Sequence, residues 1–65
     1  MPLAQIHILE GRTEEQKKRL VEEVTAAISR SLGAAPESIR VLLYELPKTH
    51  WAVGGVSMAE QAAKR

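Results

Sequence analysis

Two apolar segments on either side of one long amphipathic segment constrain the fold of this chain more than any other feature. Residues 2–9 and 39–46 are rich in Ile, Leu and Val, and only a few residues join each of them to the segment between. Strands connected through a helix in this way lie parallel in one sheet, and the crossover is nearly always right-handed. The sequence therefore predicts an α/β fold with a single small β-α-β subunit.

The first predicted strand, residues 2–9, is largely apolar on both of its faces. The alternating sets are Ala4, Ile6 and Ile8 on one face and Leu3, His7 and Leu9 on the other. This pattern is typical of a strand that is covered on two sides. We expect His7 in this setting to be a hydrogen-bonded core or interface residue rather than a base.

The helix is predicted to run from Glu14 to Leu32. Thr13 and Gln16 have the spacing of a capping box, and Gly33 is a natural C-cap. Apolar residues at three- and four-residue intervals form one stripe, which consists of Leu20, Val21, Val24, Ala27, Ile28 and Leu32. The charged residues that lie mostly away from it, as a solvated face, are Lys17, Lys18, Arg19, Glu22 and Glu23.

The C-terminal quarter of the chain predicts a small hairpin and a short helix. Pro47 to His50 ends the second strand, and Trp51 to Ser57 has the pattern of a hairpin that turns at Gly54-Gly55. Met58 to Arg65 is suited to a short helix. We expect residues 1–65 to form a single domain.

The size of the chain predicts an oligomer. It has 65 residues, of which 45% are hydrophobic, and no cysteine that would form a disulfide. A domain of this size buries only about 60% of the surface of its unfolded chain. One helix and two short strands do not cover that much apolar surface, so we expect apolar faces to pack against other copies.

The charge pattern argues against several classes of partner. The net charge is +1, with nine basic and eight acidic residues, which gives no electrostatic footprint for nucleic acid. No apolar run approaches the ~20 residues of a membrane span, and no signal peptide is visible, so we expect a cytoplasmic protein. His7 and His50 have no ligand spacing, and we expect no metal.

Pro2 is the candidate catalytic residue. It follows an initiator Met, which cells usually remove before proline, and removal leaves a secondary amine at the terminus. The strand that follows would hold this amine in place, and a rigidly held amine is a candidate general base. A proline at position two is common, however, and needs companions before it indicates a site.

Three companions are present: Arg12 after the first strand, Arg40 at the start of the second, and Trp51 in the hairpin. Pro2 and Arg40 both begin parallel strands, so they are expected to be close within one subunit or across a packed pair. Arg12 lies roughly 30 Å from Pro2 if the strand is fully extended. Neighbouring subunits would remove this separation, and the geometry leaves open which subunit supplies which Arg.

Two guanidinium groups around a base favour an anionic substrate, a small dicarboxylate or a 2-oxo acid. A neutral amine removes a proton next to a carbonyl and returns it elsewhere, and an Arg at the carbonyl oxygen stabilises the enolate. Trp51 and both guanidinium charges favour the neutral form of the amine.

Each companion also has a structural interpretation. Arg12 is then a surface turn residue, Arg40 an edge-strand gatekeeper and Trp51 an oligomer contact. In that case the protein is a non-catalytic oligomer that binds anions through its Arg pair.

The segment from Pro2 to Arg12 closely resembles the opening of the 4-oxalocrotonate tautomerase family, in the tautomerase superfamily. The resemblance continues through 15–17, 27–32, Arg40-Val41 and Gly54-Gly55, and so covers nearly the whole chain. It implies β-α-β subunits assembled into a hexamer, a trimer of dimers, with no metal or organic cofactor. The implied activity is that of a 2-hydroxymuconate tautomerase, an isomerase of aromatic hydrocarbon catabolism.

The resemblance also implies roles for the site residues. Pro2 is general base and acid, Arg12 grips the distal carboxylate, and Arg40 from a neighbouring subunit acts near the 2-oxo oxygen and its carboxylate. Trp51 stands where the family has Phe, and we expect it to wall off the amine.

Related superfamily members provide the catalytic alternatives, a hydratase, dehalogenase or decarboxylase with promiscuous tautomerase activity. Dehalogenases that hydrate 3-haloacrylates need a carboxylate to activate water, and Ala52 and Val53 occupy the related region here. Some members pair two different chains. Because Pro2, Arg12 and Arg40 are all present in this chain, a homo-hexamer is the simpler expectation.

Overall fold

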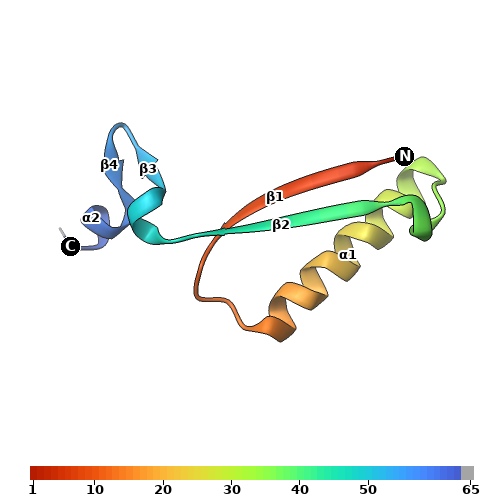
Figure 1. Cartoon of the computed structure of the whole chain (residues 1–65), viewed down its shortest axis with the longest axis horizontal. Helices are drawn as coiled ribbons and strands as arrows, with labels where there is room; N and C mark the ends of the chain where they lie inside the picture. The colour runs from red at the N-terminus through yellow and green to blue at the C-terminus, as the bar shows by residue number, and fades with distance from the viewer. Residues whose placement is uncertain (64–65) are drawn as a thin grey trace.

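The computed structural model describes residues 1–63 and contains the predicted β-α-β unit. Strand β1 (Leu3–Leu9), helix α1 (Glu14–Leu32) and strand β2 (Arg40–Leu46) follow one another, with a 3-10 helix (Pro36–Ser38) before β2. The two strands pair in parallel, from Leu3 opposite Arg40 to Leu9 opposite Leu46. Helix α1 runs along one side of this two-stranded sheet (Figure 1). The predicted strand bounds are confirmed to within one residue.

The predicted ends of α1 are confirmed. The backbone N–H of Gln16 donates to Thr13 Oγ1 at 3.1 Å, and the N–H of Thr13 donates to Gln16 Oε1 at 3.0 Å. At the other end Gly33 has φ +68°, and its N–H donates to the Ser29 carbonyl at 3.0 Å. The left-handed conformation suits glycine, which has no Cβ to clash. Both caps turn the chain sharply, and this brings β2 beside β1.

The predicted apolar stripe of α1 is only partly right. Its first members are half-buried, but Ala27 is exposed and Leu32 is 68% exposed. A helix of 19 residues is about 28 Å long, whereas a seven-residue strand spans about 23 Å. The last turn therefore extends past the sheet that would cover it.

Lys17, which was expected on the solvated face, instead lies against the sheet. Its side chain is only 16% exposed, and its Nζ donates to Glu45 Oε1 at 3.0 Å and also pairs with Glu14. Glu45 is on the face of β2 that α1 covers. The aliphatic stem of a lysine is compatible with such a position because only its end needs polar partners.

The two carboxylates, Glu14 first and then Glu45, raise the pKa of Lys17. A raised pKa in the folded state stabilises the protein below the ordinary lysine value of about 10.4, and this contribution is lost as pH rises through the folded value. We therefore expect the wild type to be more stable than Lys17→Met at pH 8, and the difference to shrink above about pH 10.5. Denaturant unfolding at both pH values measures it, and a constant difference would contradict the assignment.

The C-terminal hairpin is also confirmed. Strands β3 (Ala52–Val53) and β4 (Val56–Ser57) are antiparallel, and the turn residues Gly54 and Gly55 have φ +63° and +84°. Positive φ at both central residues is the geometry of a type I′ turn, which glycine favours. Helix α2 (Met58–Ala63) follows, and the rest of the helix predicted to Arg65 lies outside the described residues. Figure 1 shows this C-terminal part standing away from β1, α1 and β2.

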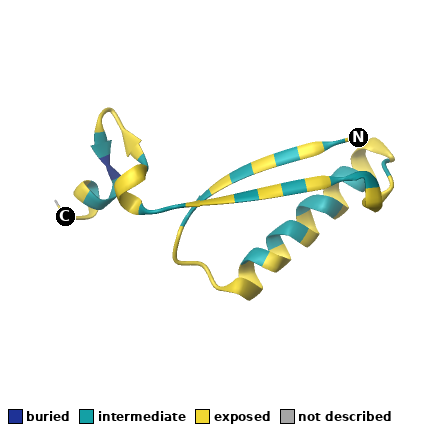
Figure 2. Cartoon of the chain, viewed as in Figure 1, coloured by how far each residue is buried: buried dark blue, intermediate teal, exposed yellow. Residues whose placement is uncertain are grey.

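A single chain leaves much of its apolar surface uncovered. No hydrophobic side chain within residues 1–63 is fully buried. The radius of gyration is 15.2 Å, against about 11 Å for a compact chain of this length. The accessible surface is 5072 Å², against about 4,100 Å² for a folded monomer of this mass. One face of the sheet is open (Figure 2). Strand β1 was predicted to be covered on both faces, but within one chain only the face toward α1 is covered.

Candidate functional site

Pro2 and Arg40 lie side by side at the amino edge of the sheet. The Arg40 N–H donates to the Pro2 carbonyl at 3.0 Å, which extends the β1–β2 pairing by one residue. The prediction that the two strand starts are neighbours is confirmed. Pro2 is half-buried, whereas Met1 before it is 84% exposed. The ladder engages Pro2 only through its carbonyl, so the position tolerates a residue with no amide N–H.

Arg12 and Trp51 lie at the opposite, carboxyl edge. Arg12 is exposed in the connection from β1 to α1, and Trp51 follows β2 after the 3-10 helix Lys48–His50. The Met58 N–H donates to the Trp51 carbonyl at 2.7 Å, which ties Trp51 to the start of α2. Seven residues of β1 separate this edge from Pro2, a span of about 23 Å.

One chain therefore does not bring its four candidate residues together. It holds Pro2 with Arg40 at one end of the sheet and places Arg12 and Trp51 beyond the other end (Figure 1). The strands do not curl back on themselves. Arg40 lies at one end and Arg12 at the other, so two ends that meet would present both guanidinium groups to a substrate, an arrangement that favours binding of a dianion.

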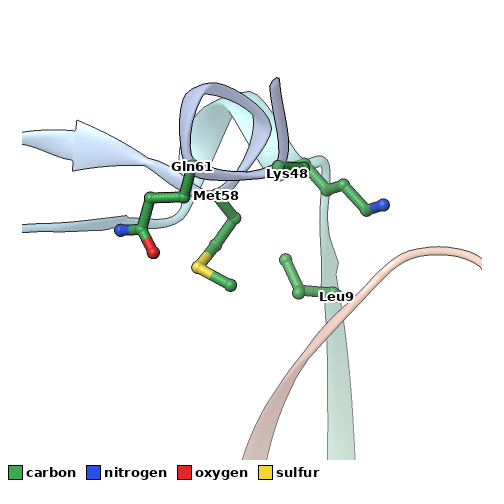
Figure 3. Close-up of a pocket in the computed structure, with 5 residues that line it drawn as sticks. Leu9, Lys48, Met58 and Gln61 are labelled. Carbon is green, nitrogen blue, oxygen red and sulfur yellow. The ribbon is translucent and has the colours of Figure 1, made fainter. Parts of the chain in front are cut away.

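A small, mostly apolar pocket lies at the carboxyl edge and was not expected from the sequence. Its volume is about 230 Å³, and it is lined by Leu9, Lys48, Met58, Gln61 and Ala62. In Figure 3 the side chains of Leu9 and Met58 lie in the space between β1 and α2. The sequence contains one indication of this pocket. Leu9 at the end of the first strand and Met58 at the start of the short helix are apolar, and local sequence patterns identify no packing partner for either of them.

The described part of the chain offers no metal centre. Within residues 1–63 no group of three or more His, Cys, Asp or Glu side chains is placed to hold an ion. In the same range, no helix combines the length and apolarity needed to cross a membrane.

Comparison with known protein families finds one matching family model. It is described as a tautomerase enzyme, and it matches residues 2–61 of this chain. The match begins at Pro2 and includes Arg12, Arg40 and Trp51.

Named relatives agree with this match. A protein of Stutzerimonas stutzeri named 2-hydroxymuconate tautomerase is 60% identical over 57 residues, which are 88% of this chain and 90% of the relative. A protein of the same name from Comamonas testosteroni is 48% identical over 60 residues, 92% and 95% of the two chains.

Solved structures have the same fold. One from a study of the 4-oxalocrotonate tautomerase isozymes of Methylibium petroleiphilum superposes with a TM-score of 0.95 at 39% identity, over 98% of this chain and all of that one. A heterohexamer 4-oxalocrotonate tautomerase from Chloroflexus aurantiacus gives a TM-score of 0.87 at 43% identity, over 92% and 97% of the two chains. The predicted β-α-β architecture with C-terminal strands is confirmed.

Proposed function

This chain belongs to the tautomerase family and is an isomerase, and from that premise we propose that Pro2 moves a proton within a 2-hydroxymuconate-like dienol. The observation that carries the proposal is the pairing of Pro2 with Arg40 at the amino edge of the sheet. It puts a terminal amine, once Met1 is removed, beside a residue whose guanidinium binds oxyanions. The relatives named 2-hydroxymuconate tautomerase support the substrate class.

In the proposed reaction the Pro2 amine takes the proton of the 2-hydroxyl group and delivers it to C5. The double bonds shift along the chain, and the product is a conjugated 2-oxo-3-enedioate. Arg40 stabilises the negative charge that develops on the 2-oxo oxygen, and Arg12 holds the distal carboxylate. Trp51 walls off the amine from water and so favours its neutral, basic form.

We propose that a second copy of the chain supplies Arg12 and Trp51 to the site of Pro2. The support is the length of β1, which keeps a chain's own Arg12 about 23 Å away. The family resemblance implies that the Arg40 acting on the substrate comes from a neighbouring subunit, whereas the Arg40 whose N–H pairs with Pro2 belongs to the same chain; each chain therefore brings both residues to this edge of the assembly. The resemblance also implies that residues 1–65, as one domain, form a homo-hexamer. The relative from Chloroflexus aurantiacus is a heterohexamer, but this chain has Pro2, Arg12 and Arg40 together.

The test of the mechanism is the state of the amino terminus. N-terminal mass spectrometry of an active preparation is expected to find a chain that begins at Pro2. A form made to retain Met1, in which Pro2 is an amide, is expected to lose roughly 10²- to 10⁴-fold in turnover of 2-hydroxymuconate, the range of general acid–base catalysis. Full activity in the retained form would rule out the amine mechanism.

Hydration of a 3-haloacrylate is the second candidate activity. It needs a carboxylate to activate water, and the hairpin strand at the site carries Ala52 and Val53, which have none. This favours proton transfer over hydration. A panel that measures both 2-hydroxymuconate isomerisation and halide release separates the two activities.

A further inference from the structure

The connection between β1 and α1 carries Arg12, and neither this connection nor the first residues of α1 are packed. Residues 10–16 are all exposed, whereas Leu9 before them and Lys17 after them are half-buried. Figure 1 shows the connection as a loop beyond the end of the sheet. A segment without buried apolar contacts is held mainly by its hydrogen bonds. The position of Arg12 therefore depends on how the two ends of the connection are attached.

The first attachment is made by the backbone. The Glu10 N–H donates to the carbonyl of Leu46, the last residue of β2, at 2.9 Å. This bond continues the parallel ladder one residue beyond the end of β1. It fixes the chain two residues before Arg12, and it does not depend on any side chain.

The second attachment is made by the side chain of Lys17. Its Nζ donates to Glu45 Oε1 at 3.0 Å, and its backbone N–H donates to the Thr13 carbonyl at 3.1 Å. Thr13 is the residue after Arg12, and Glu45 is the last residue but one of β2. Arg12 therefore lies between two attachments to the same end of one strand.

The pair of Lys17 and Glu45 has the setting of a structural link rather than of a loose surface contact. Exposed ion pairs contribute little because both side chains stay mobile and solvated. Here the Lys17 side chain is only 16% exposed, and that of Glu45 is 37% exposed. Among residues 1–63, no other side-chain hydrogen bond or ion pair joins α1 to the sheet. Lys17 also pairs with Glu14, but that contact lies within α1.

We propose that Lys17 and Glu45 are positioning residues that hold Arg12 in place for the distal carboxylate of the substrate. The inference rests on the proposed function, in which Arg12 binds that carboxylate. A guanidinium on a loosely attached connection has to be ordered whenever substrate binds, and this ordering weakens binding. An attachment made in advance removes that cost. Both attachments lie in the chain that supplies Arg12, whichever subunit's site it serves.

The experiment compares two substrates that differ only in the group that Arg12 binds. One is 2-hydroxymuconate, and the other is 2-hydroxypenta-2,4-dienoate, the same dienol without the distal carboxylate. Lys17→Met is expected to raise KM for the first about tenfold, within the roughly 10²-fold that a misplacement of ~1 Å costs. It is expected to leave kcat nearly unchanged, and to leave both constants unchanged for the second substrate. Lys17→Arg, which keeps a charged donor at the position, is expected to behave as the wild type.

Glu45→Met separates positioning from a direct effect of charge. Lys17→Met removes a positive charge and Glu45→Met a negative one, so a direct effect on a dianion would move KM in opposite directions. Loss of the link instead raises KM in both variants. Lys18→Met is the control for loss of a lysine, since Lys18 is exposed on α1 and has no ion pair within residues 1–63. Val24→Ala, at a half-buried position farther along α1, is the control for lost stability. Both controls are expected to keep the KM of the wild type.

Combination with Arg12→Ala tests whether Lys17 acts through Arg12. Once Arg12 is absent there is no guanidinium to position, so Lys17→Met is expected to raise KM for 2-hydroxymuconate no further. Three results would overturn the inference: an unchanged KM in both Lys17→Met and Glu45→Met, opposite shifts in the two variants, or a full further rise in the double variant.

The same measurements keep this inference apart from the proposed function. If Arg12→Ala raised KM for 2-hydroxymuconate and Lys17→Met did not, the inference would be lost and the proposed role of Arg12 would stand. If Arg12→Ala left this KM unchanged, the proposed role of Arg12 would be lost, and the inference with it.

Discussion

Pro2→Ala is expected to lower kcat/KM for 2-hydroxymuconate by roughly 10²- to 10⁴-fold, the contribution of a positioned general base. Met1 is removed before alanine as well, so the variant has a primary amine that rotates about its own backbone bonds. The pyrrolidine ring, in contrast, fixes the nitrogen relative to β1. The fold is expected to survive, because Pro2 engages the sheet through its carbonyl, which accepts from the Arg40 N–H, and alanine keeps that group.

Pro36→Ala is the matched control for this substitution. Pro36 is exposed at the start of the 3-10 helix before β2 and is outside the proposed site. The Pro36→Ala substitution is expected to leave turnover of 2-hydroxymuconate unchanged. If Pro2→Ala and the wild type had equal turnover, another group would be the base. This comparison requires wild-type chains in which Pro2 is shown to be the first residue.

Arg12→Ala is expected to lower kcat/KM by about 10²- to 10³-fold, because a charged group that orients and stabilises the substrate is lost. The more telling result comes from mixed oligomers. When Pro2→Ala and Arg12→Ala chains are unfolded together and reassembled in equal amounts, activity is expected to reappear. If a site takes Pro2 from one chain and Arg12 from another, about a quarter of the sites receive both intact residues.

The same experiment has a clear opposite outcome. If Pro2 and Arg12 came from one chain, every chain in the mixture would lack one of them and no site would be complete. Arg30→Ala is the control for loss of an exposed arginine, since Arg30 is exposed in the last turn of α1 and is not one of the proposed site residues. It is expected to retain full activity alone and in mixtures.

The sequence was a good guide wherever local chemistry determines the backbone. Thr13, Gln16 and Gly33 predict both ends of α1 because a cap is made by residues that are adjacent in sequence. Gly54-Gly55 predicts the hairpin turn for the same reason. The pairing of Pro2 with Arg40 also followed, since parallel strands that start together keep their first residues together.

The sequence was a poor guide where burial depends on the relative lengths of two elements. Periodicity placed Leu32 on the buried stripe and Lys17 outside it, but α1 is longer than the strands and Glu45 draws Lys17 against the sheet. The pocket between Leu9 and Met58 was missed because it joins residues 49 positions apart, from elements that no local pattern connects.

The absence of a fully buried hydrophobic residue within the range 1–63 has a consequence for how this protein is made. In the proposed assembly, other copies would cover the apolar surface that one chain leaves exposed, and part of the stability of each subunit would come from association. Folding and association would then be coupled, and the folded population would depend on the protein concentration. A subunit released from the proposed assembly would lose those contacts and, with them, part of its stability.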